Sequence, residues 1–354
     1  MLQTPLYDEH VSLGGKIVDF NGWALPVQFA GIVQEHNHTR SKASIFDCSH
    51  MAEFRIRGAN AVRAYGDLVC SDLANLRIGR SKYGALLNES GGIIDDLISM
   101  KIADDDLFIV TNAGPREAVA NIFSSAGSGV EDVTDSTAKI DIQGPLARDV
   151  LVQELPIAAE LNYFEIRSAE WNGEAIFVSR TGYTGEMGFE LFVPNSLAVP
   201  LWRALLAHGE VEPAALGARD TLRTEAGYLL SGQDFQETRT PLEARMERFV
   251  AWDTPFVGKD ALVHQRDQGG YPRLAAIASP DRRAPRHDFE LRRKGTPVGV
   301  VTSGTFGPSV GHGIGLAYLE EEYLTPGTKL EAGPRGLEVS VVDLPFYADG
   351  TCRN

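Results

Sequence analysis

The sequence predicts a mixed α+β fold followed by a smaller C-terminal part built from β-strands alone. Up to about residue 265, segments with a helical pattern alternate with segments of β-type residues. Beyond residue 270 only short β runs separated by Gly and Pro remain, which is typical of a small barrel or sandwich. The polar, Gly-rich stretch 265–270 divides the two patterns, so we place a domain boundary there.

Turn signals and apolar periodicity define the individual elements. Gly14-Gly15 and Asn21-Gly22 mark turns in a β-rich opening, and Asn172-Gly173 between two alternating runs is a strong hairpin signal. Trp202 lies on the apolar stripe of its helix, so we expect it in the core rather than at a ligand. We expect helices at residues 32–44, 60–69, 116–124, 146–152, 195–208 and 217–228, and strands at 53–57, 98–102, 107–111, 138–143, 164–171, 174–180, 190–193, 274–278, 298–302, 315–319, 329–332 and 337–342.

Composition excludes several classes of protein. The 354 residues, 43% of them hydrophobic, are enough for two to three domains with real cores. No stretch approaches the roughly 18 apolar residues of a membrane span, and the N-terminus lacks a signal-peptide pattern, so we expect a cytoplasmic protein with no membrane partner. The scattered cysteines Cys48, Cys70 and Cys352 are expected to be reduced.

Charge and motif content narrow the ligands. A net charge of −15 argues against a nucleic-acid partner, because phosphate binding needs a basic face. His36 and His38 have no partners at metal-ligand spacing, so we expect no metal. Neither a phosphate-binding GxxxxGK[ST] loop nor a GxGxxG after a strand is present, so we expect no nucleotide cofactor.

The stretch 83–114 carries the first candidate chemistry. Its strands at 98–102 and 107–111 flank the acidic tip Asp104-Asp105-Asp106, and Gly91-Gly92 precedes two adjacent carboxylates, Asp95 and Asp96. Side chains alternate along a strand, so the two carboxylates should face opposite ways and one can point into a cleft. The alternative is that both are turn residues.

The stretch 180–190, RTGYTGEMGFE, is the densest signal. Three glycines within seven residues let the backbone approach a ligand closely, and Tyr183 offers an aromatic face. A carboxylate accepts two bonds in a fork, which suits a planar heterocycle with two parallel N–H donors, and Glu190 is better placed for this than Glu186. The alternative is a hairpin turn with a surface glutamate.

Two further stretches contain groups that could contact a ligand. Arg219 and Arg223 share one helical face and can fix carboxylates or carbonyl oxygens, or lie on a solvated face. The loop 303–309 is rich in hydroxyls and could line a binding site. No GxSxG elbow accompanies it, which argues against a serine hydrolase.

Many ordered motifs together resemble one family. The chain from Thr4 to Tyr347 is similar to the aminomethyltransferase family, the T-protein of the glycine cleavage system. The motifs that carry this resemblance are FDCSHM (46–51), YGALLNESGGIIDDL (83–97), RTGYTGEMGFE (180–190), LGARDTLRTEAG (216–227), TPLEA (240–244), FVGKDAL (256–262), VTSGTFGPSVG (301–311) and LPFY (344–347).

The resemblance implies a three-domain arrangement around a central folate channel. A folate-binding α+β domain would comprise residues 1–48 and 138–243, a ferredoxin-like domain 49–137 and 244–268, and a β-barrel domain 269–354. The stretches 232–239, 252–255 and 284–291 depart from the family pattern, which bears on the far wall of the channel and on partner docking.

The resemblance also implies site residues and a reaction. Asp95 would be the catalytic carboxylate, and Glu190 would grip the pterin ring of tetrahydrofolate. The other residues expected in the folate pocket are Arg223, Tyr83, Met51, Asn112 and Tyr183.

The implied reaction moves the one-carbon unit of the aminomethyl group on the lipoyl arm of H-protein to tetrahydrofolate and releases ammonia. The alternatives are a tetrahydrofolate-dependent demethylase of the same superfamily and a folate-binding protein without turnover. The most basic segment, residues 282–294, is expected to face the partner protein.

Overall fold

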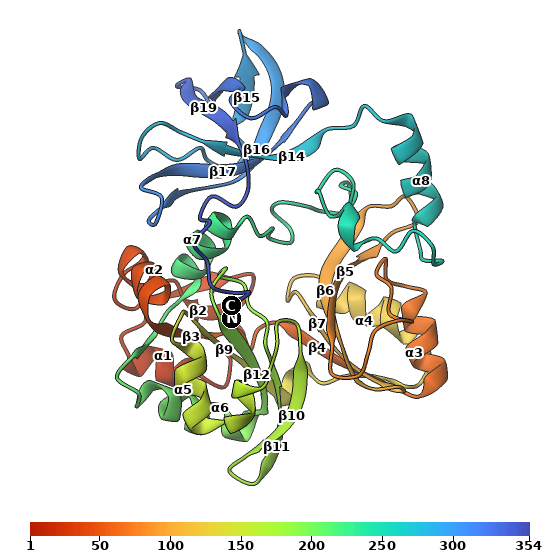
Figure 1. The fold of residues 1–354 in the computed structure, drawn as a ribbon, viewed down its shortest axis with the longest axis vertical. Coiled ribbons are helices and arrows are strands. Elements are labelled where there is room, and N and C mark those ends of the chain that lie inside the picture. The colour runs from red at the N-terminus through yellow and green to blue at the C-terminus, as the bar shows by residue number, and fades with distance from the viewer.

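The computed structural model describes residues 1–354, which form three parts, each with its own sheet (Figure 1). The first part is a six-stranded sheet packed against helices. The strand order is β10 (Ile166–Trp171), β11 (Glu174–Ser179), β12 (Gly188–Pro194), β9 (Thr137–Gln143), β3 (Ala43–Asp47) and β13 (Val211–Pro213). Helices α1 (Tyr7–Ser12), α2 (Ile32–Ser41), α5 (Ala147–Glu154), α6 (Asn195–Leu206) and α7 (Leu216–Ala226) belong to the same side of the molecule in Figure 1, beside the hairpin β1 (Ile17–Phe20) and β2 (Trp23–Pro26).

The second part is a five-stranded sheet with two helices. Its strand order is β5 (Ser81–Leu87), β6 (Ile93–Ala103), β7 (Asp106–Thr111), β4 (Ala52–Arg57) and β8 (Val130–Asp132), and its helices are α3 (Ala59–Gly66) and α4 (Arg116–Ser124). Phe123 of α4 packs edge-on against Phe54 of β4 and Tyr65 of α3, with ring centroids 5.1 Å apart in both pairs. Aromatic contacts of this kind fasten both helices to one face of the sheet.

The third part is a closed barrel, drawn in blue in Figure 1. Its strands run in the order β14 (Arg273–Ala278), β17 (His312–Leu319), β16 (Thr296–Gly307), β15 (Glu290–Arg293), β18 (Lys329–Ala332) and β19 (Leu337–Val342). The mixed α+β fold with a C-terminal β-barrel is therefore confirmed, and closure decides between barrel and sandwich. No helix of the structure has the length and apolar character needed to cross a membrane.

Local signals in the sequence located the Asn172-Gly173 hairpin well. Trp171 pairs with Glu174 across Asn172 and Gly173, which have φ angles of 51° and 81°, as a tight hairpin turn requires. The stretch 265–270, where we expect a domain boundary, overlaps the end of α8 (Lys259–Gln268). Gly269, with φ 62°, ends that helix.

The sheets support a division of the chain into domains. β3 and β9 are neighbours in one sheet although the whole second sheet lies between them in sequence. Phe256 and Leu262 pack in one apolar cluster with Leu87 and Ile93 of the second part. We therefore propose the limits 1–48 with 138–243, 49–137 with 244–268, and 269–354.

Trp202 tests the packing of the first part. It is 0% exposed and packs in the core cluster with Leu197, Leu201 and Leu205, as its helical position predicts. We expect Trp202→Ala to lower the free energy of unfolding by about 3–5 kcal/mol, because the indole leaves a cavity. Urea unfolding followed by circular dichroism measures this. The control Val33→Ala removes a side chain that is 47% exposed and should change stability little. Equal stabilities of the two variants would contradict the assignment.

Candidate functional site

Two carboxylates of β6 meet at one amide in the second part of the molecule. The side-chain nitrogen of Asn112, just after β7, donates to Asp95 Oδ1 at 2.8 Å and to Asp96 Oδ1 at 2.6 Å. Asp95 and Asp96 pair in regular register with Leu86 and Ala85, and the extra residue of the β6 bulge, Ile94, precedes both. Asp95 is buried and Asp96 is half-buried, as alternation along a strand predicts, yet both carboxylates reach the same amide. Both residues lie within β6, so the alternative that they are turn residues is excluded.

The two carboxylates differ in exposure and partners. Asp95 is 0% exposed and also accepts from the Asn112 backbone N–H at 2.9 Å and from the Ser231 hydroxyl at 2.8 Å. Asp96 is half-buried and accepts from the Tyr83 hydroxyl at 2.8 Å. Burial and then the neighbouring Asp96 charge raise the pKa of Asp95 to about 7, and burial also raises the pKa of Asp96. Such a pair is poised to hold or lose one proton near neutral pH.

A buried charge cluster surrounds Glu190 on the first sheet. The Lys139 ammonium lies 2.7 Å from Glu190 and 2.5 Å from Asp141, and Arg219 lies 3.0 Å from the other Asp141 oxygen. Burial alone would lower the pKa of Lys139, but Asp141 and Glu190 outweigh it and hold that pKa above its ordinary value. Thr181 donates to the second Glu190 oxygen. Glu190 is thus a buried charged group of β12, not a surface residue in a turn.

Tyr183 joins this charge cluster to the segment that follows α7. The Arg219 guanidinium stands 4.9 Å from the centre of the Tyr183 ring, and the Tyr228 ring stacks on it with centroids 5.8 Å apart. The Tyr183 hydroxyl donates to the carbonyl of Leu229. Tyr183 is half-buried, so it keeps part of its surface accessible to a ligand.

Arg223 lies 1% exposed, and protein groups occupy most of its donors. It binds Asp234 at 2.7 Å, Asp220 at 2.8 Å and the Ser303 hydroxyl of the barrel at 2.8 Å. A solvated helix face is therefore excluded for Arg223. Ser303, from the hydroxyl-rich stretch 303–309, lies in strand β16 and accepts a hydrogen bond from this arginine.

Met51 lies between two apolar clusters. It packs against the cluster that contains Phe46 and against the cluster that contains Phe108, and it remains half-buried. The first of these clusters lies in the first part, and the second joins Phe108 of the second sheet to Phe192 of the first, so Met51 sits where the two sheets meet.

The expected site residues thus fall into two groups joined by one segment. Tyr83, Asp95 and Asn112 form the first group with Asp96, and Glu190 and Tyr183 belong to the second. The segment 228–234 links them: Ser231 contacts Asp95, Leu229 contacts Tyr183, and Asp234 contacts Arg223. Sequence reasoning missed Ser231, Asp234, Asp141 and Lys139.

Among these four missed residues, only Lys139 and Asp141, which lie in a strand, belong to a recognisable sequence pattern. Lys139 and Asp141 alternate with apolar residues in β9, a pattern that ordinarily marks a solvent face, so it pointed to the wrong environment. Ser231 lies in a polar stretch without periodicity.

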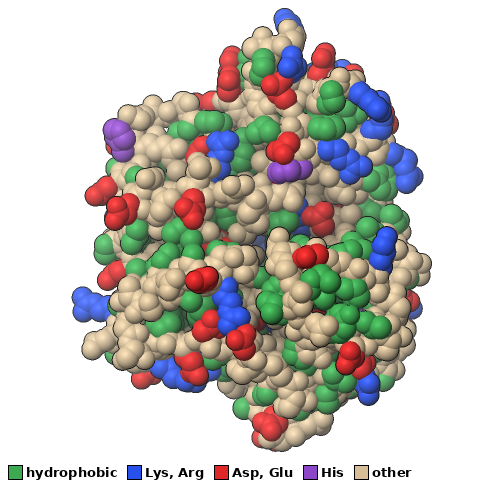
Figure 2. Space-filling model, turned by 180° about the vertical axis from the view of Figure 1, so that it is seen from behind, with side chains coloured by type: hydrophobic (Ala, Val, Ile, Leu, Met, Phe, Trp, Pro, Cys, Tyr) green, Lys and Arg blue, Asp and Glu red, His purple; other side chains and the backbone are tan.

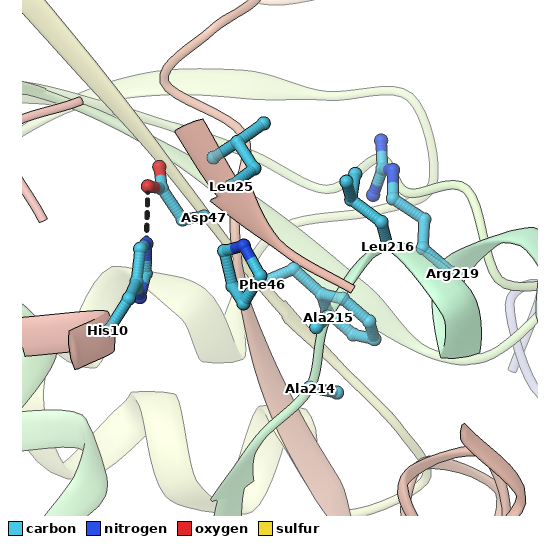
Figure 3. A pocket seen from close by; sticks show the side chains of 9 residues that line it. His10, Leu25, Phe46, Asp47, Ala214, Ala215, Leu216 and Arg219 are labelled. Carbon is cyan, nitrogen blue, oxygen red and sulfur yellow. Dashed lines mark hydrogen bonds and ion pairs between the residues drawn. The ribbon is translucent and has the colours of Figure 1, made fainter. Parts of the chain in front are cut away.

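The molecule is hollowed where the parts meet (Figure 2). A separate small cavity is lined by Arg219, His10, Phe46 and Asp47 among others (Figure 3). It measures about 10 Å³, enough for about one water molecule and far too little for a folate. His10 of α1 and Asp47 of β3, which lie 2.7 Å apart there, form a buried pair that holds the helix against the strand.

Comparison with known proteins assigns the family. The model of the GCVT N-terminal domain matches residues 6–254, and that of the glycine cleavage T-protein C-terminal barrel domain matches residues 273–348. An aminomethyltransferase of Clostridium botulinum (strain 657 / Type Ba4) is 40% identical over 98% of both chains. One from Thermoanaerobacter sp. (strain X514) is 38% identical over 98% of this chain and 97% of its own.

A solved structure agrees with this assignment. The crystal structure of glycine cleavage system aminomethyltransferase T from Bartonella henselae superposes with a TM-score of 0.93, at 34% identity and 99% coverage of both chains. The chain therefore belongs to the glycine cleavage T-protein family of aminomethyltransferases.

Proposed function

We propose that this protein is the aminomethyltransferase of the glycine cleavage system in the cytoplasm. It takes the aminomethyl group carried on the lipoyl arm of H-protein, releases ammonia and leaves 5,10-methylenetetrahydrofolate. The family supports this assignment, and the observation that carries it within the site is the pair of carboxylates, Asp95 and Asp96, held by Asn112.

Asp95 is the catalytic carboxylate in this proposal. It holds the amine of the transferred group as a cation and orients it against N5 of the folate. Positive charge develops on the amine side as the carbon–sulfur bond breaks, and a fixed carboxylate stabilises that charge. The three hydrogen bonds from Asn112 and Ser231 fix the position of Asp95 before substrate binds.

Glu190 binds the pterin ring. Each of its oxygens accepts one bond within the protein, from Lys139 or from Thr181, and each keeps a second lone pair for a ring N–H or amino group. Tyr183 supplies an aromatic surface beside it, and Tyr83, Asn112 and Met51 complete the pocket. Arg223 shapes the pocket by holding segment 228–234 through Asp234.

The alternative, a folate-dependent demethylase, shares the folate pocket and differs in its methyl donor. A folate-binding protein without turnover would have no evident need for a buried carboxylate of raised pKa. A single assay distinguishes an aminomethyltransferase from a demethylase, because only aminomethyl transfer releases ammonia.

The catalytic role of Asp95 is tested by Asp95→Asn, assayed as ammonia release with tetrahydrofolate and aminomethyl-loaded H-protein. We expect kcat to fall by at least about 100-fold, since one preorganised electrostatic group is typically worth that much. Asp96→Asn is the matched control and should retain more activity. If Asp96→Asn abolished turnover while Asp95→Asn kept it, the catalytic role would belong to Asp96.

The pH profile tests the same carboxylate. The reaction needs Asp95 ionised, so kcat should fall as pH drops through about 7. The Ser231 hydrogen bond lowers the pKa of Asp95, so Ser231→Ala should raise that pKa and move the acidic limb to higher pH. Ser125→Ala, at an exposed site, should leave the limb in place. A limb that moves to lower pH in Ser231→Ala would contradict the assignment.

Docking of H-protein is proposed at the basic segment 282–294 of the barrel. Arg286 and Lys294 are exposed there, and reversing both to Glu should raise KM for H-protein severalfold, with a smaller effect at high salt. Folate binding should not change. Arg57→Glu, an exposed reversal on β4, is the control. An unchanged KM for H-protein in the double variant would place docking elsewhere.

A further inference from the structure

The last residues of the chain leave the barrel and lie across the glycine-rich loop between β11 and β12. Figure 1 shows the dark blue end of the chain running from the barrel to the first sheet. The Tyr347 N–H donates to the carbonyl of Glu225 at 3.0 Å, and the Cys352 N–H donates to the carbonyl of Gly185 at 3.1 Å. We call residues 347–354 the tail strap, and residues 180–188 the glycine loop.

Thr351 makes the most contacts between the strap and the loop. Its backbone N–H and its hydroxyl donate to one oxygen of Glu186, at 3.1 and 2.5 Å. The same hydroxyl accepts from the Met187 N–H at 2.8 Å. One side chain therefore satisfies a buried carboxylate and a backbone donor of the loop together.

Glu186 connects Thr351 to helix α2. It is 3% exposed, and its other oxygen accepts from Arg40 of α2 at 2.8 Å. Arg40 also donates to the carbonyl of Thr184 at 2.7 Å and stands 4.3 Å from the centre of the Tyr347 ring. The loop is thus held on one side by α2 and on the other by the strap.

The strap and the loop fit closely. A Cβ atom on Gly350 would lie 2.4 Å from the carbonyl oxygen of Gly185, so the two backbones pack at a distance that only glycine permits. Arg180, at the start of the loop, donates to the carbonyl of Cys352 at 3.4 Å. Contacts therefore run from the beginning of the loop to Met187.

The loop needs such support because of its composition. Gly182, Gly185 and Gly188 give it large conformational freedom, which must be lost when a ligand is gripped. The same loop carries Tyr183 and leads directly into Glu190. Fixing the loop in advance removes part of the entropy cost from binding.

We propose that Thr351 is a positioning residue for the folate pocket. Through Glu186 and Met187 the tail strap holds the glycine loop in the conformation that presents Tyr183 and Glu190 to the pterin ring. This inference rests on the proposed function. The matched barrel model ends at residue 348, so most of the strap, Thr351 included, lies beyond it.

The test is Thr351→Val, which keeps the shape of the side chain and removes its hydroxyl. We expect faster amide hydrogen exchange in residues 182–187 of the ligand-free protein. We also expect the Kd for tetrahydrofolate, measured by calorimetry, to rise about tenfold, the usual effect of losing one hydrogen bond to a charged group. At saturating folate, kcat should stay near wild type, because Thr351 does not touch the reacting atoms.

Two controls separate positioning from general damage. Thr351→Ser restores the hydroxyl and should recover both the slow exchange and the folate affinity. Thr296→Val makes the same change at an exposed barrel position and should alter neither. Unchanged exchange in Thr351→Val, or faster exchange with wild-type folate affinity, would overturn the proposal.

The proposed function can fail separately. If the wild-type protein itself bound no tetrahydrofolate, the folate assignment would fall, and the role of the strap in folate binding with it. If the wild type bound folate and Thr351→Val bound it equally well, only the strap proposal would be overturned.

Discussion

The ion pair between Arg223 and Asp234 is the interaction on which the assembled site depends. Both side chains are almost fully buried, and Asp234 also accepts from the Thr302 hydroxyl at 2.5 Å, while its carbonyl accepts from Tyr318 at 2.8 Å. Thr302 and Tyr318 belong to the barrel and Arg223 to α7. Two buried charges are tolerated only when each is fully paired, and removing one partner of such a pair typically costs about 3–5 kcal/mol. The pair therefore fixes segment 228–234 relative to the barrel and to the first sheet.

Segment 228–234 connects this packed ion pair to the candidate site. It positions Ser231 against Asp95 and Leu229 against Tyr183, so groups from different sheets hold fixed relative positions. The charge cluster at Lys139 follows the same rule, because a buried ammonium persists only between carboxylates. Charge pairing inside the protein thus fixes the side chains that we propose to bind folate and to stabilise charge.

Local rules predicted the secondary-structure elements, but they could not predict contacts between residues that are far apart in the sequence. The helix at 116–124 and the hairpin at Asn172-Gly173 follow from periodicity and turn chemistry, which act over a few residues. The meeting of Asp95 and Asp96 at one amide does not, because it depends on Asn112, which follows the neighbouring strand β7. Ser231 carried no signal, since its role exists only through a partner 136 positions away. The proposed site residues came from resemblance to a family rather than from spacing.

The pairing of β3 with β9 has a consequence for how the protein is made. β3 emerges from the ribosome early, yet its antiparallel neighbour is complete only at Gln143, after the whole second sheet. At roughly 5–20 residues per second, the first strand waits several seconds for its partner during synthesis. The inserted sheet, whose strands are close in sequence, can fold during that interval and bring the two ends of its own segment together. The first sheet then closes around a second sheet that has already folded, so β3 can pair with β9 as soon as β9 has been synthesised. This limits the time for which β3 is exposed to other chains.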